Sequence, residues 1–309
     1  MPTSVRHRSV GIRNHGAPVC YPTMRRWIPL LLLISCYQQS KPVVSDSYAA
    51  EIDKWRTDRR ARLLSDNGWL TLVGLDWLHD GTNDVTLPAH PSVTVRLILN
   101  NAKVTLQPNP SVAIAGPTVL RDDTDPQGPT VIRIDTLNFQ IIKRADKSGD
   151  RFGVRVKDTE SESRKNFKGL DYFTTNPAYR IEARFEPYQP PKKIAITNVL
   201  GMTSDETSPG ALVFTLEGRD FRIDPILEQG EKDLFIIFKD ATSGKETYAA
   251  ARYLYAHPPD TTGKTIVDFN KSYNPPCVFT PYATCPLPPP QNRLPIRVEA
   301  GEKKYAGHA

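Results

Sequence analysis

The sequence has no long hydrophobic run and few of the residues that metal sites and disulfide frameworks require. No stretch approaches the roughly 20 apolar residues that a bilayer-spanning helix needs, which excludes a multi-span membrane protein. The 309 residues include only 4 cysteines and 6 histidines, and the histidines lack metal-ligand spacing. With 39% apolar residues, the composition also excludes a collagen-like or wholly disordered chain.

The common catalytic signatures are missing as well. The sequence contains no G-x-S-x-G, no H-E-x-x-H and no G-x-G-x-x-G. Gly263-Lys264-Thr265 does not complete a phosphate-binding loop, because Pro258 stands where the first glycine is needed. We therefore expect no cofactor and no bound metal, and the motifs by themselves name no reaction.

Basic residues are concentrated near the amino terminus. The first 35 residues hold five of the 40 basic residues and none of the 34 acidic ones, so the rest of the chain is nearly neutral. A folded part without a cationic excess gives no support to nucleic-acid binding, despite a pI near 9.0. We expect no nucleic-acid partner.

The amino-terminal segment resembles a bacterial lipoprotein signal. Arg25 and Arg26 precede a short apolar run that ends in L-I-S-C at residues 33–36, a pattern in which the cysteine is acylated. A lipid on Cys36 would anchor the protein to a membrane surface outside the cytoplasm. Tyr37, in place of Asp, favours the outer membrane of the cell envelope. The alternative is a buried apolar segment with an incidental cysteine.

These observations divide the chain into four parts. Residues 1–23 are expected to be a mis-called upstream extension, with the true start at Met24. Residues 24–35 form the signal peptide and 36–46 a polar tether. Residues 47–309 form the folded domain, where the proline-containing segment 186–193 is either a sub-domain boundary or a crossover between sheets.

The folded part begins with one helical pattern and continues with strand patterns. Ser45, Asp46 and Ser47 offer helix caps, and apolar residues follow at helical spacing to about Ser65, where Asn67-Gly68 ends the helix. From residue 87 to 215 the period is two, as in 93–99, 131–134, 137–141 and 179–185, and a later strand is predicted at 234–238. The pattern predicts a mainly β fold: an antiparallel barrel or sandwich, one amphipathic amino-terminal helix and a proline-rich carboxy-terminal loop.

The proline-rich loop is the most distinctive segment. Ten of the 28 prolines lie between Pro258 and Pro295. Aromatic and aliphatic residues are interleaved with them and would be costly to leave in water, so we expect an ordered loop that packs on the sheet.

The run from Asp268 to Leu294, with segments 68–70 and 77–78 upstream, resembles bacterial proteins of the domain-of-unknown-function 1684 family. Segments 167–173, 211–214 and 238–252 extend the resemblance, which spans about Tyr48 to Lys304. It implies an uncharacterised and often exported family with no established reaction.

Two cysteines lie within the loop, Cys277 and Cys285. In a compartment that permits disulfides, we expect them to form a bridge. Two free buried thiols, or a reactive or metal-binding pair, are the alternatives, although the spacing is neither C-x-x-C nor a usual zinc arrangement.

Polar residues in the loop are the candidate site. If the protein is an enzyme, Asp268 is the candidate general base and Tyr273 or Tyr282 the proton donor. The candidate ligand-binding residues of the loop are Asn270, Asn274, Tyr282 and Asn292. The alternative is that Asp268 and the asparagines cap turns where proline cannot donate a hydrogen bond.

Two upstream arginines are further candidates. Arg155 or Arg252 would bind an anionic group if either folds against the loop. Arg155 is otherwise expected to form a surface ion pair with Asp158.

Three functions remain open from the sequence. The first is a membrane-anchored lipoprotein that binds a small molecule, a glycan or an envelope protein partner through the loop face. The second is a metal-independent hydrolase or lyase with Asp268 near its centre, and the third is a structural envelope component.

Overall fold

The computed structural model describes residues 43–88, 90–108 and 118–307. The expected extension, the signal peptide, Cys36 and most of the tether lie outside these described residues. Pro42–Ala309 form one compact unit. None of the helices within the described ranges is long and apolar enough to cross a membrane.

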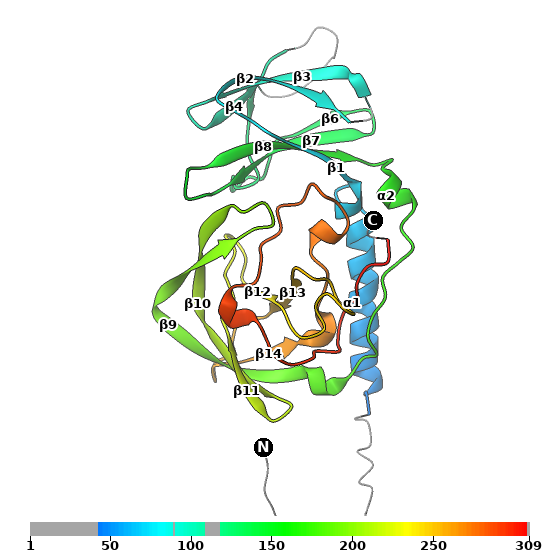
Figure 1. The fold of residues 1–309 in the computed structure, drawn as a ribbon, viewed down its shortest axis with the longest axis vertical. Helices are drawn as coiled ribbons and strands as arrows, with labels where there is room; N and C mark the ends of the chain where they lie inside the picture. The colour runs from blue at the N-terminus through cyan, green and yellow to red at the C-terminus, as the bar shows by residue number, and fades with distance from the viewer. Residues whose placement is uncertain (1–42, 89, 109–117, 308–309) are drawn as a thin grey trace, which may run out of the picture. The chain divides into compact units, whose positions relative to one another are not determined.

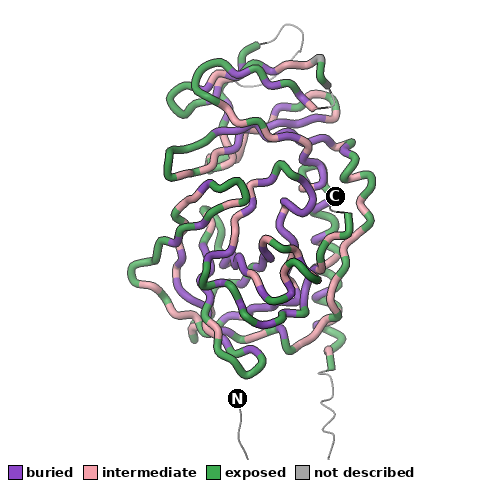
Figure 2. The backbone as a smooth tube through the Cα atoms, in the orientation of Figure 1, coloured by how far each residue is buried: buried purple, intermediate pink, exposed green. Residues whose placement is uncertain are grey.

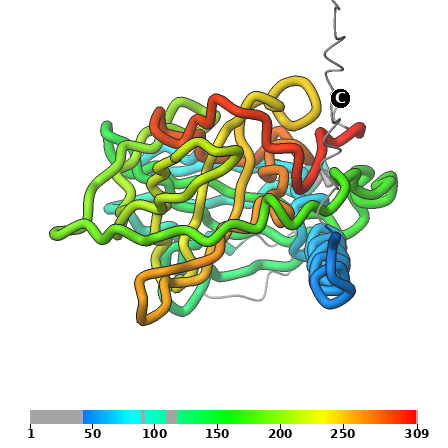
Figure 3. The backbone as a smooth tube through the Cα atoms, turned by 90° about the horizontal axis from the view of Figure 1, so that it is seen from below, coloured from blue at the N-terminus to red at the C-terminus, as the bar shows by residue number. Residues whose placement is uncertain are grey.

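Helix α1 (Asp46–Leu64) begins and ends close to where the sequence predicts. The Ser45 side chain caps it by accepting a hydrogen bond from the Tyr48 amide at 3.3 Å. Gly68 follows the helix so closely that an added Cβ would lie 2.1 Å from the Leu63 carbonyl oxygen. Only glycine fits at this position, which explains the sharp exit from the helix. In Figure 3 the helix is seen end-on at one side of the sheets.

A β-sandwich follows the helix, with two four-stranded antiparallel sheets (Figure 1). Apolar residues from both sheets, such as Leu97 and Val154, form its core. The strands of the first sheet, in spatial order, are β1 (Leu72–Trp77), β8 (Arg151–Asp158), β7 (Leu137–Arg144) and β6 (Val131–Ile134). Those of the second are β2 (Gly81–Leu87), β3 (His90–Asn100), β4 (Lys103–Leu106) and β5 (Val119–Leu120).

A second pair of sheets is built from the rest of the chain. Their shared core includes Leu212, Phe238 and Phe269. The larger sheet has the order β11 (Arg219–Ile223), β10 (Thr203–Leu216), β9 (Arg180–Thr197) and β14 (Lys264–Asp268). The smaller sheet pairs β12 (Leu234–Phe238) with β13 (Arg252–Ala256). Short helices α2 (Glu162–Lys165), η1 (Trp69–Thr71) and η2 (Pro177–Tyr179) lie in the connections.

Segment 186–193 lies inside the 18-residue strand β9. Its prolines fit there for two reasons. The pairing with β14 ends at Arg184, which leaves one edge of β9 open beyond that point. The pairing with β10 shifts register between Ser208 and Gly210, opposite these prolines.

The carboxy-terminal segment is ordered and irregular, as predicted. Helices η3 (Phe269–Lys271), η4 (Pro276–Val278) and η5 (Pro290–Asn292) are single turns within it. Leu294, Ile296 and Val298 then enter the core of the second sheet pair. Much of the segment is buried (Figure 2). The structure therefore confirms a mainly β, antiparallel fold with one long amino-terminal helix.

Candidate functional site

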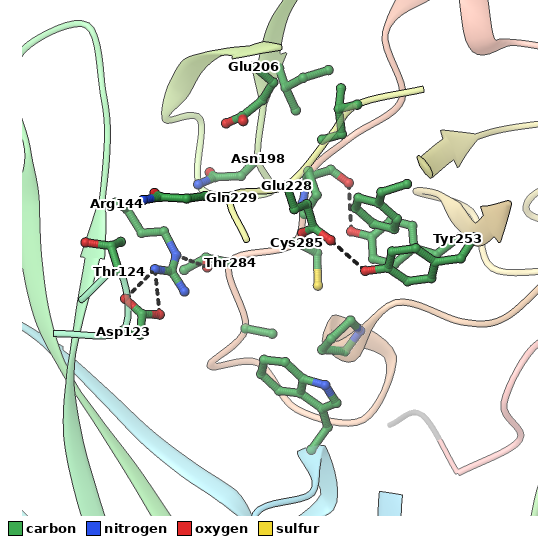
Figure 4. Close-up of a pocket in the computed structure, with 18 of the residues that line it drawn as sticks. Asp123, Thr124, Arg144, Asn198, Glu206, Glu228, Gln229, Tyr253, Thr284 and Cys285 are labelled. Carbon is green, nitrogen blue, oxygen red and sulfur yellow. Dashed lines mark hydrogen bonds and ion pairs between the residues drawn. The ribbon is translucent and has the colours of Figure 1, made fainter. Parts of the chain in front are cut away.

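A cavity of about 1370 Å³ lies where the β1-β8-β7-β6 sheet faces β12, β13 and the carboxy-terminal loop. Its walls come from segments far apart in the sequence: α1 and η1, the sandwich, the smaller sheet and residues 283–286 of the loop. Figure 4 shows part of this lining. The loop therefore forms one wall of the cavity.

Strand β8 carries two cations on the face that turns away from the sandwich core, and one of them, Arg155, lines the cavity. Phe152, Val154 and Val156 point into the sandwich core, so by the two-residue period Arg155 and Lys157 lie on the opposite face. The Trp69 ring lies beside both: its centroid is 5.1 Å from the Arg155 guanidinium carbon and 6.0 Å from Lys157 Nζ.

Arg155 is buried, with 6% of its surface exposed, and its Nε has no hydrogen-bond partner among the described residues. The expected surface ion pair with Asp158 is therefore wrong: the two side chains leave opposite faces of β8, because they are three positions apart in a strand. Burial, and then the charge of Arg144, lower the pKa of Arg155 to about 10. A cation–π contact is worth about 0.5–2 kcal/mol. It does not offset the several kcal/mol that burying a guanidinium costs.

Aromatic rings form another wall. The Tyr255 ring stacks on the Phe235 ring, with their centroids 4.9 Å apart. The centroids of the Tyr255 and Tyr273 rings are 6.3 Å apart. The Tyr253 ring meets Tyr273 edge-on at 5.8 Å. Burial raises the pKa of Tyr253, Tyr255 and Tyr273, so all three stay protonated at neutral pH. Tyr273 is thus the candidate loop residue that faces the cavity.

Polar groups complete the lining (Figure 4). Arg144 Nη1 lies 2.8 Å from a carboxylate oxygen of Asp123, and Arg144 Nε donates to Thr284 Oγ1 at 3.0 Å. Across the cavity, the Tyr255 hydroxyl donates to Glu228 at 2.7 Å. Burial raises the pKa of Glu228. The cavity therefore offers fixed donors, acceptors and aromatic faces, as small-molecule sites do.

Asp268 lies away from this cavity's lining, at the end of β14. It is 5% exposed and accepts hydrogen bonds from the Tyr48 hydroxyl at 2.8 Å and the Asn270 amide at 3.1 Å. Asn270 also donates to the Asn176 carbonyl at 2.9 Å. Burial raises the pKa of Asp268. The contacts are those of a capping group that ties the loop to α1, and a catalytic role stays a prediction.

Three other candidates are committed to internal contacts. Asn274 donates to the Lys303 carbonyl at 2.8 Å, and Asn292 donates to the Asp224 carbonyl at 2.9 Å. Arg252 is 1% exposed and pairs with Asp240 at 3.1 Å. Burial lowers the pKa of Arg252. These side chains hold the loop onto the second sheet pair.

Tyr282 is 37% exposed and is not part of the cavity lining. Cys277 and Cys285 are both free thiols in the structure, so the expected bridge is not formed there. The two residues are nevertheless adjacent, because the Cys277 amide donates to Cys285 Sγ at 3.1 Å. The hydrogen bond from Cys285 lowers the pKa of Cys277, and burial raises that of Cys285.

Sequence reasoning missed the cationic face of β8 and a buried ion pair. Arg59 Nε on α1 lies 2.9 Å from Glu302 Oε1, with side chains 8% and 0% exposed. The alternation in residues 151–158 was the available signal, since Arg and Lys alternate there with apolar residues. Within the described ranges, no three His, Cys, Asp or Glu side chains converge as metal ligands.

Comparisons with known proteins identify a family without an assigned activity. An uncharacterized protein from Haloarcula marismortui, solved by solution NMR, is 30% identical, and the alignment covers 47% of this chain and 81% of that one with a TM-score of 0.40. No curated protein matches the chain. A family model described as "Protein of unknown function (DUF1684)" matches residues 165–303, a shorter region than the sequence resemblance spanned. Over those residues the chain carries the pattern of this DUF1684 family, which confirms the resemblance.

Proposed function

We propose that this protein is an exported lipoprotein whose β domain binds a small organic molecule in the cavity. The observation that carries the proposal is the aromatic wall of Phe235, Tyr253, Tyr255 and Tyr273 in a concavity of about 1370 Å³. Ligand sites in proteins are concave and largely apolar, with a few fixed polar groups that orient the ligand. Glu228, Arg144 and Thr284 are such groups here.

The cavity favours a small molecule over a protein partner. A protein interface of standard size needs a broad surface with exposed anchors. Tyr273 is instead recessed among other side chains, and Tyr253 behind it is only 3% exposed, so the wall offers a ligand the edges and faces of Tyr255 and Tyr273 but no broad surface to a protein.

The aromatic wall gives a direct test of binding. We would titrate phenyl phosphate, benzoate and phenyl β-D-glucoside by calorimetry into the wild-type domain and the Tyr255→Ala variant. Losing one stacking ring should weaken binding by about two- to tenfold, since aromatic contacts are worth about 0.5–1.5 kcal/mol. Tyr282→Ala is the control, because Tyr282 has a similar exposure, 37% against 40%, away from the cavity. No binding of any probe would overturn the proposal.

Membrane attachment rests on the sequence alone and is tested separately. The Cys36→Ser variant cannot be acylated, so it loses the lipid chains that stable membrane anchoring needs. It should therefore move from the membrane fraction to the soluble fraction of an expressing bacterium. Cys277→Ser is the matched control and should leave the protein in the membrane fraction. Retention of the Cys36→Ser variant would contradict the lipid anchor.

A further inference from the structure

We infer that the β8 end of the cavity binds an oxyanion, a carboxylate or phosphate group of the organic ligand, through the guanidinium of Arg155. This inference rests on the proposed function and names the chemistry of the ligand.

Arg155 has no counter-ion among the described residues. The side chain is more than nine-tenths buried, lines the cavity, and its Nε has no acceptor among the described residues. Its terminal nitrogens likewise form no ion pair with any described carboxylate. A buried guanidinium needs acceptors in its own plane, and the open side is the cavity.

The charges around Arg155 also favour an anion. Lys157, two positions along the same strand face, is 9% exposed and donates to the neutral Asn67 carbonyl at 2.7 Å. Burial and the charge of Arg155 lower the pKa of Lys157 to about 8. Asp123, the nearby carboxylate, is already held by Arg144 at 2.8 Å. The region therefore carries an excess of buried positive charge, which an anion would neutralise.

Aromatic rings lie on both sides of the space where the anion would bind. The Arg155 guanidinium carbon lies 5.1 Å from the centroid of the Trp69 ring, so the ring limits how the guanidinium can move. A planar guanidinium held this way can donate two parallel hydrogen bonds to one oxyanion. The organic part of the ligand would then extend toward Tyr253 and Tyr273, which line the same cavity.

A structural role for Arg155, as a partner of Trp69 only, is the competing interpretation, and it makes the opposite prediction for the ligand-free protein. If Arg155 serves to bind an anion, its unpaired buried charge destabilises the ligand-free protein, and Arg155→Met should unfold at the same or a higher temperature than wild type. If the cation–π contact holds the fold, the variant should unfold at a lower temperature, and that result would overturn the inference.

Calorimetry with phenyl phosphate, inorganic phosphate and neutral phenol tests the ligand chemistry. We expect phenyl phosphate to bind most tightly and Arg155→Gln to weaken it by about 30-fold, the size expected for charge-assisted hydrogen bonds. The affinity of Arg155→Lys for phenyl phosphate should lie between those of wild type and Arg155→Gln, because lysine keeps the charge but not the bidentate geometry. Arg133→Gln, an exposed residue on β6, makes the same charge change away from the cavity and should bind as wild type does.

The outcomes separate this inference from the proposed function. Equal binding of phenol and phenyl phosphate, unaffected by Arg155→Gln, would refute the oxyanion site and leave small-molecule binding standing. Inorganic phosphate binding as tightly as phenyl phosphate, with loss in Arg155→Gln, would keep the oxyanion site and refute the organic ligand. Binding of none of the three probes would refute both.

Discussion

The buried ion pair between Arg59 and Glu302 should control how the carboxy-terminal segment is held on helix α1. One Glu302 oxygen accepts from Arg59 Nε at 2.9 Å, and the other accepts from the Asn274 amide at 2.7 Å. Arg59 also donates to the Asn274 carbonyl at 2.9 Å and lies 4.7 Å from the centroid of the Tyr273 ring. The Glu302→Gln variant removes the negative charge and keeps one acceptor oxygen.

The stability lost in Glu302→Gln depends on how deeply the ion pair is buried. The Arg59 and Glu302 side chains are 8% and 0% exposed, so the guanidinium left behind cannot regain its water. Removing one partner of a buried pair costs about 3–5 kcal/mol. We expect the lower end of that range, because glutamine can still accept one hydrogen bond. For a domain of this size, about 3 kcal/mol lowers the melting temperature by about 6–12 °C.

Urea and thermal unfolding, followed by circular dichroism, measure this loss. Glu299→Gln is the matched control, because Glu299 pairs with Arg297 at 2.8 Å on the surface, where both side chains are more than 40% exposed. Solvated pairs contribute little, so the control should unfold as wild type does. Equal losses in the two variants would refute the buried pair. An Arg59→Met, Glu302→Gln double variant should recover part of the loss, because no unpaired charge then stays buried.

Two further predictions concern buried titratable groups. Because burial raises the folded-state pKa of Asp268, its contribution to stability is present below pH about 4 and declines as the pH rises through the raised folded value. Asp268→Asn lacks this titration, so urea unfolding at pH 4 and pH 7 should show wild-type stability falling relative to the variant, and an unchanged difference would contradict the buried carboxyl. Cys277 and Cys285 are 9% and 4% exposed, so their thiols should be protected in the folded protein. Intact mass should show that iodoacetamide alkylates both cysteines in the denatured, reduced protein and neither in the folded, reduced protein. Rapid labelling of the folded protein would show that the loop opens.

Local sequence patterns predicted most of the helices and strands of the fold. The strands predicted at 131–134 and 234–238 coincide with β6 and β12, and the caps and helical spacing after Ser45 located α1. These signals are local because a strand or helix face needs only its own alternation of apolar residues. Segment 186–193 was ambiguous because three prolines usually interrupt a sheet, and only the open edge and register shift of β9 accommodate them.

The site depended on long-range contacts that a single sequence does not encode locally. Tyr48 and Asp268, which share a hydrogen bond, are 220 positions apart. Arg155 was identified as a possible anion-binding residue, but its place in the cavity depends on how β8 faces the loop. Arg252 looked equivalent in sequence and instead pairs with buried Asp240. Polar residue type thus suggested candidates, and burial and partners separated them.

A crystal structure of the domain soaked with phenyl phosphate tests the central claim most directly. The account predicts the phosphate oxygens about 3 Å from the terminal nitrogens of Arg155, the usual length of a charge-assisted hydrogen bond. The phenyl ring should contact Tyr255 and Tyr273 of the aromatic wall. A phosphate held elsewhere, with Arg155 still unpaired beside Trp69, would contradict it.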